Sequence, residues 1–180
     1  MLRVCFTGHR PNKLGGYNWD SAKNIEIMDK INDVVKNLII LNQDKEFYFI
    51  TGGALGIDQV AFKIVNELKG VFEDITITQE ISVPFEKQPK AWFDKRDIDR
   101  YNTQLSMADK ITYVDKLERY KCKNSKIGEY SPSKMQLRNM YMVDNSDIVI
   151  AVWNGDKKGG TWNCIKYARN KNKKIVYIYV

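Results

Sequence analysis

Six short apolar runs alternate with helical patterns along this chain of 180 residues, and that alternation constrains the fold more than any other feature. The runs predict strands at residues 2–7, 47–51, 75–83, 110–114, 147–153 and 174–180. Between them, apolar residues recur every three or four positions, which predicts amphipathic helices over about 25–39, 57–68, 95–108, 134–143 and from about Thr161. Because the runs lack in/out alternation, we expect a mostly parallel sheet with helices on both faces.

We therefore predict a single doubly wound, Rossmann-like α/β domain over residues 1–180. A length close to the roughly 150 residues of one domain agrees with this interpretation, and no internal repeat is visible. Residues 115–133 are highly charged, contain Gly128 and Pro132, and show little periodicity. We interpret them as a surface insertion within the domain.

Composition narrows the class of protein. Hydrophobic residues make up 43% of the chain, which excludes disordered, collagen-like and coiled-coil classes. No run approaches the roughly 18 apolar residues of a membrane span, and the N-terminal run is too short for a signal peptide. We expect a cytoplasmic protein with no membrane partner.

Cysteine usage and charge give two further expectations. Cys5, Cys122 and Cys164 have no CxxC spacing, so we predict neither a disulfide framework nor a zinc site. We also expect no other metal and no cofactor. The net charge of +7 favours anionic partners, although much of it lies in residues 116–126 and 169–174, which are typical of solvated surface.

Two glycine-rich loops each join a strand to a helix, at the edge of the sheet where ligands bind in this architecture. The first is TGGALGID, residues 51–58, in which Gly53 and Gly56 have the spacing of the dinucleotide fingerprint. The second is NGDKKGGT, residues 154–161, which has Walker A glycine spacing but lacks its lysine. Such loops offer backbone amides to a phosphate, with a tight turn that binds nothing as the alternative.

Three further groups carry candidate residues. Gly8, His9 and Arg10 follow the first strand; Arg10 can grip a phosphate, and His9 either acts in acid–base chemistry or hydrogen-bonds its loop. On the helix before the apolar strand, Asn139 accompanies Arg138, which either contacts a ligand or forms a salt bridge to Asp144 or Asp147. Asp58 either binds a ribose hydroxyl or stabilises its helix start, and Thr161 either caps its helix or binds phosphate.

The segment PFEKQPKAW after the third strand adds Gln88 and Trp92 to the candidates. Trp92, Trp153 and Tyr17 are aromatic residues that either stack on a base or pack in the core.

Taken in order, the strings TGHRP with KLGGY, TGGALGID, PFEKQPKAW, RNMYMVDNSDIVIAVW and GDKKGGT resemble the YpsA-like branch of the SLOG superfamily. These are Rossmann-like relatives of the DNA-processing protein A and of the cytokinin-activating phosphoribohydrolases, and the resemblance runs from Cys5 to about Ala168. It implies a nucleotide-derived ligand, such as ADP-ribose or an NAD-related molecule, bound across the glycine loops. The pocket it implies comprises Gly8, Arg10, Gly52, Gly53, Gly56, Asp58, Arg138, Asn139, Gly159, Gly160 and Thr161.

This sequence differs from the phosphoribohydrolases at one position that matters for catalysis. The phosphoribohydrolases have a PGGxGTxxE motif whose glutamate assists cleavage of the N-glycosidic bond, and Cys164 stands in that place here. Whether the chain is an enzyme is therefore left open, and no catalytic residue is assigned.

We favour a sensor or sequestering domain for a nucleotide-derived small molecule. The first alternative is an N-glycosidic hydrolase in which Asp58, Glu80 or Glu86 replaces the missing glutamate. The second is a protein that binds single-stranded nucleic acid through its basic surface. Association with further copies of the chain stays open.

Overall fold

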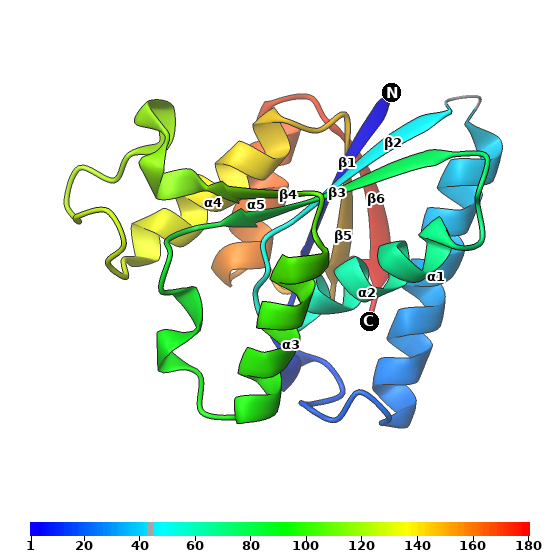
Figure 1. Cartoon of the computed structure of the whole chain (residues 1–180), viewed down its shortest axis with the longest axis horizontal. Helices are drawn as coiled ribbons and strands as arrows, with labels where there is room; N and C mark the ends of the chain where they lie inside the picture. The colour runs from blue at the N-terminus through cyan, green and yellow to red at the C-terminus, as the bar shows by residue number, and fades with distance from the viewer. Residues whose placement is uncertain (43–44) are drawn as a thin grey trace.

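The computed structural model describes residues 1–42 and 45–180 and contains one six-stranded parallel sheet with α-helices on both faces (Figure 1). The strands are β1 (Leu2–Gly8), β2 (Glu46–Thr51), β3 (Thr76–Val83), β4 (Lys110–Tyr113), β5 (Ile148–Trp153) and β6 (Lys174–Tyr179). The α-helices are α1 (Ala22–Leu41), α2 (Ile57–Lys69), α3 (Lys95–Met107), α4 (Pro132–Asp144) and α5 (Gly159–Asn170). The predicted fold class is confirmed.

The strand order is β4-β3-β2-β1-β5-β6, so β1 lies inside the sheet between β2 and β5. In this register Cys5 of β1 lies beside Ile50 of β2 and Val149 of β5. Every residue of β5 is buried, as expected for a parallel strand covered on both faces. This is why β5 is an uninterrupted apolar run in the sequence.

The helices cover the two faces of the sheet according to the direction in which the chain travels. Val4 and Phe6 of β1 pack with α1 and α2, whereas the intervening Cys5 packs with Met142 of α4 and Cys164 of α5. The helix α3 joins the first face by packing near α2 and β3. Because right-handed crossovers change face when the chain reverses direction, this separation follows from the strand order.

The reversal of direction places a crevice at the carboxyl ends of β1 and β5. The chain leaves β1 toward β2 on one side, and β5 lies on the other side of β1. The loops after these two strands diverge, and such a switch point is where ligands bind in open parallel sheets.

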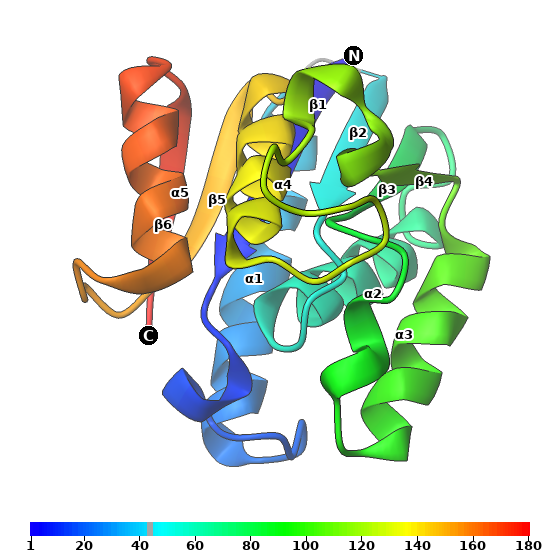
Figure 2. The same ribbon diagram turned by 90° about the vertical axis from the view of Figure 1, so that its left-hand side faces the viewer.

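The segment between β4 and α4 lies on the same side of the sheet as α4 (Figure 2). It contains two short 3₁₀-helices, η3 (Val114–Lys116) and η4 (Glu118–Tyr120). Lys134, which is 1% exposed, donates to the carboxylate of Asp115 at 3.0 Å and to the carbonyl of Glu129 at 2.8 Å. A buried lysine thus fixes the predicted insertion.

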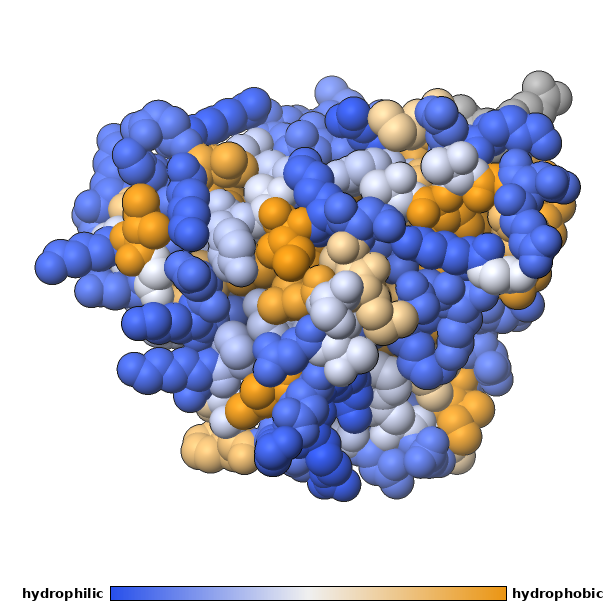
Figure 3. Space-filling view, in the orientation of Figure 1, coloured by the Kyte–Doolittle hydropathy of each residue, from blue (hydrophilic) through white to orange (hydrophobic). Residues whose placement is uncertain are grey.

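The surface seen in Figure 3 is mostly hydrophilic, with small and separate apolar areas. No helix among the described residues is long and apolar enough to cross a membrane.

Candidate functional site

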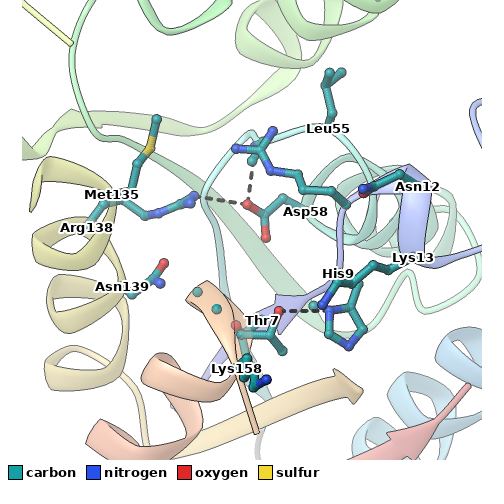
Figure 4. A pocket seen from close by; sticks show the side chains of 16 residues that line it. Thr7, His9, Asn12, Lys13, Leu55, Asp58, Met135, Arg138, Asn139 and Lys158 are labelled. Atoms are coloured by element: carbon teal, nitrogen blue, oxygen red, sulfur yellow. Dashed lines mark hydrogen bonds and ion pairs between the residues drawn. The ribbon is translucent and has the colours of Figure 1, made fainter. Parts of the chain in front are cut away.

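A pocket with a volume of about 400 Å³ lies at the switch point, where four parts of the chain meet (Figure 4). They are the end of β1 with its following loop, the loop after β2 with the start of α2, one face of α4 and the start of α5. The lining residues are Thr7, Gly8, His9, Arg10, Asn12, Lys13, Ala54, Leu55, Asp58, Met135, Arg138, Asn139, Lys158, Gly159, Gly160 and Thr161.

Most of the predicted site residues are brought together here. Those that line the pocket are Gly8, His9, Arg10, Asp58, Arg138, Asn139, Gly159, Gly160 and Thr161. Those that do not are Gly52, Gly53, Gly56, Gln88 and Trp92. The division is informative, because the structure gives the glycines of the loop after β2 a different role.

The centre of the pocket is an ion pair between α4 and α2. The Arg138 guanidinium donates to the Asp58 carboxylate at 2.9 Å, with both side chains at most 10% exposed. The sequence-based expectation of a salt bridge to Asp144 or Asp147 is therefore wrong. Asp144 accepts from the hydroxyls of two tyrosines, and Asp147 accepts from the backbone amide of Arg3.

Both members of the pair are further constrained. Asp58 also accepts a hydrogen bond from the Ala54 amide at 3.2 Å, so its carboxylate fixes the loop after β2. The Nε of Arg138 is buried and has no hydrogen-bond partner in the part of the chain that the structure describes. Since unpaired buried donors are costly, Arg138 is the group at this site that most needs an acceptor.

Gly52 provides the space that Arg138 occupies. A Cβ at this position would lie 1.0 Å from Nη1 of Arg138 and 2.7 Å from the Asp58 carboxylate. Any side chain larger than hydrogen would therefore displace the guanidinium. The glycine is required by the ion pair.

Gly56 allows two loops to pack against each other. Its φ is +95°, and a Cβ there would lie 2.4 Å from the carbonyl oxygen of His9. That carbonyl accepts from the Ile57 amide at 3.3 Å. The amides of Ala54 and Ile57 are thus already bonded inside the protein.

The start of α5 is different. Its N-cap residue, Lys158, has an extended backbone and makes no side-chain capping bond. The backbone amides of residues 159–161 have no hydrogen-bond partner within the described residues. Thr161 is the third residue of α5, so the expectation that it caps the helix is wrong. These amides and the helix dipole favour an anion.

His9 connects the loop after β1 to the loop after β5. Its Nε2 lies 2.8 Å from the side-chain oxygen of Asn154, and its Nδ1 lies 3.4 Å from the hydroxyl of Thr161. The imidazole is 4% exposed, and this burial lowers its pKa, so it is neutral at pH 7. These contacts agree with the interpretation that His9 hydrogen-bonds its surroundings.

Cationic side chains outnumber carboxylates around the pocket. Arg10, Lys13, Arg138 and Lys158 line it, against the single carboxylate of Asp58. Burial and the nearby charge of Arg138 lower the pKa of Arg10. An anion in the pocket would be attracted by both guanidinium groups.

Several lining residues were not among the predicted site residues, although most lie in the predicted loops: Thr7, Asn12, Lys13, Ala54, Leu55, Met135 and Lys158. Two of them had a usable signal. Lys158 directly precedes the glycines that open α5, and Met135 lies three positions before Arg138 on the same helix face. Lys13 lies far in the sequence from Asp156, with which it pairs at 2.8 Å.

The groups considered for hydrolysis lie mostly elsewhere. Glu80 is 1% exposed and accepts from the hydroxyls of Tyr48 and Tyr141, and Glu86 is exposed and pairs with Lys116 at 3.4 Å. Burial raises the pKa of the Cys164 thiol to about 11, so it stays protonated at neutral pH. Of the three candidate carboxylates, only Asp58 lines the pocket.

The remaining predicted residues lie beside the pocket or in the core. The Gln88 side-chain amide donates to the carbonyl of Gly52 at 3.4 Å, which is a supporting contact. Trp92 and Tyr17 line a neighbouring cavity. Trp153 is buried and stacks on Trp162. Among the described residues, no group of three His, Cys, Asp or Glu side chains is placed to hold a metal ion.

The doubly wound parallel sheet with a cationic pocket at its switch point places the protein among Rossmann-like α/β proteins. Comparison with known families makes this more specific. The chain belongs to the YspA SLOG family, whose model matches residues 4–179.

Two relatives show how far the similarity extends. The uncharacterized SPbeta prophage-derived protein YoqJ of Bacillus subtilis (strain 168) is 41% identical over 145 residues, covering 81% of each chain. A UPF0398 protein of Bacillus cereus is 26% identical over 174 residues, covering 96% of this chain and 85% of its own.

Proposed function

We propose that this protein binds a nucleotide-derived, phosphate-containing ligand in the pocket at the switch point, as a sensor or sequestering domain. The observation that carries the proposal is the start of α5. Its amides at residues 159–161, which have no partner in the part of the chain that the structure describes, line the same hollow as the guanidinium groups of Arg10 and Arg138. A phosphate has enough oxygens to accept from both sides at once.

The ion pair explains how the pocket holds one arginine ready for a ligand. Asp58 bonds to one terminal nitrogen of Arg138 and so fixes the direction of the guanidinium. The remaining donors of a planar guanidinium keep their geometry for a second acceptor. Because the orientation is fixed before binding, little conformational entropy is lost when the anion arrives.

The positions of the carboxylates favour a protein that binds its ligand without cleaving it. General acid–base cleavage of an N-glycosidic bond needs a carboxyl group within hydrogen-bond reach of the reacting atoms. Of the residues in ranges 1–42 and 45–180, Asp58 is the one carboxylate that lines the pocket, and it is bonded to Arg138 and to the Ala54 amide. A carboxylate held in this way is a positioning group for arginine.

The test is calorimetric titration with ADP-ribose, NAD and nucleoside monophosphates, followed by chromatography of the recovered ligand. We expect saturable binding of at least one ligand, which is returned intact. Lys158→Gln should weaken that binding about fivefold, as expected for one charge near a protein surface. Lys157→Gln is the matched control, because Lys157 is the exposed neighbour that does not line the pocket, and it should change affinity less than about twofold.

The absence of binding across the whole panel would contradict the proposal. Equal losses in the two lysine variants would place the ligand elsewhere. Release of free base during incubation would favour the hydrolase instead.

A further inference from the structure

A second cavity adjoins the phosphate pocket and differs from it in chemistry. It has a volume of about 570 Å³ and shares two lining residues, Arg10 and Leu55, with the pocket at the switch point. Its other lining residues are Tyr17, Ala91, Trp92, Phe93, Asp94 and Asp97. We call it the aromatic cavity.

The aromatic cavity presents rings to solvent. Phe93 is fully exposed, and Tyr17 is 58% exposed. An apolar group stands out at the lower left of the molecule, over the segment between η2 (Gln88–Ala91) and α3 (Figures 1 and 3). Burial of exposed aromatic rings by a ligand is favourable, so rings beside a polar pocket indicate a surface on which part of a ligand can pack.

One of these rings is held in place from behind. Trp92 packs edge to face against Tyr101, with 5.3 Å between ring centroids and an interplanar angle of 78°. Tyr101 is itself 2% exposed, so it gives Trp92 a rigid support. A fixed indole loses little freedom when a second ring packs on it.

The charge changes from one cavity to the other. Among the described residues, the pocket at the switch point is lined by four cationic side chains and one carboxylate. The aromatic cavity is lined by one cation, Arg10, and by the carboxylates of Asp94 and Asp97, of which Asp94 pairs with Arg96 at 2.7 Å. Asp97 is 6% exposed and pairs with Arg100 at 2.8 Å. Carboxylates accept hydrogen bonds from hydroxyl and amino groups and repel phosphate.

We infer that the ligand spans both cavities as a nucleotide, with a phosphate at the start of α5 and its base against the rings of the aromatic cavity. The inference rests on the proposed function and adds what that function leaves open, namely where the base lies and what distinguishes a nucleotide from a simple phosphate. Arg10 lies at the junction and contacts both ends of the ligand.

The experiment compares ligands with and without a base. Wild-type protein is titrated in a calorimeter with adenosine monophosphate, ADP-ribose, ribose 5-phosphate and inorganic pyrophosphate. We expect the two nucleotides to bind at least tenfold more tightly than the two baseless phosphates. Phe93→Ala should weaken nucleotide binding about tenfold, as expected for loss of one stacked ring, and leave pyrophosphate binding unchanged.

The control variant is Leu41→Ala, which removes another exposed apolar side chain, 79% exposed at the end of α1, and should change neither affinity. Trp92→Leu is a second variant of the cavity and should act in the same direction as Phe93→Ala. If pyrophosphate binds as tightly as the nucleotides, or if Phe93→Ala weakens both alike, the inference fails and the phosphate pocket stands. If none of the four ligands binds, the proposed function fails together with the inference.

Discussion

The two glycine-rich loops look alike in sequence and differ in structure. In the loop after β2, Gly52 and Gly56 are buried, and a Cβ at either would collide with Arg138 or with the His9 carbonyl. At the start of α5, Gly159 and Gly160 are exposed, and a Cβ at either would meet nothing within 4 Å. The first loop uses its glycines for internal packing, and the second leaves its backbone open.

Hydrogen bonding follows the same division. The amides of Ala54 and Ile57 in the first loop donate to acceptors inside the protein. The amides of residues 159–161 have no such acceptor among the described residues. A glycine-rich turn therefore indicates close backbone approach, and only the partners of its amides show whether it approaches a ligand or another part of the protein.

The largest expected difference in the free energy of unfolding is between two single variants, Gly52→Ala and Gly160→Ala. A methyl group at Gly52 would displace Arg138 and leave Asp58 buried without its cation, which should lower the free energy of unfolding by about 4 kcal/mol. Gly160→Ala fills open space at a helical position and should raise it by up to about 0.5 kcal/mol. Urea unfolding followed by circular dichroism measures both. Similar free energies for the two variants would remove the distinction between the loops.

A second pair separates backbone strain from packing. Gly56 and Gly159 both have positive φ, at +95° and +81°. An alanine at Gly159 suffers the strain alone and should cost about 1 kcal/mol. An alanine at Gly56 adds the collision with the His9 carbonyl, for a total of about 3 kcal/mol. Equal costs, measured by the same unfolding curves, would show that the two loops do not press on each other in solution.

The sequence predicted the strands, helices and parallel sheet because these depend on local periodicity and on burial. It also predicted that the loops after β1, β2 and β5 meet, since parallel strands bring their carboxyl ends to one edge. It added Gln88 and Trp92 from the loop after β3, which do not line the pocket. It failed where a partner is distant in sequence. Arg138 pairs with Asp58, eighty positions away, and neither residue type nor spacing identifies that partner. The role of Gly52 was missed for the same reason, because it depends on where that guanidinium lies.

The smallest expected effect on stability comes from the titration of His9, which contacts both loops. Its carbonyl accepts from Ile57 in the first loop, and its ring lies against Asn154 and Thr161 in the second. Burial lowers the pKa of this imidazole in the folded protein, so the unfolded chain binds the proton more readily. Stability is therefore retained in full above a pH of about 6.5, falls as the pH drops below that value, and levels off below the folded-state pKa.

The measurement is urea unfolding of wild type and His9→Gln between pH 5 and pH 8. This is the only histidine in the chain, so the difference between the two pH profiles isolates its titration from that of the carboxylates. Protonation of His9 should lower stability but raise the affinity for an anion, because the imidazolium adds positive charge to the pocket. The affinity for ADP-ribose, whose diphosphate keeps a constant charge over this range, should rise as the pH falls in wild type and stay level in His9→Gln. Parallel stability profiles for the two proteins would show that the ring is not held neutral between the loops.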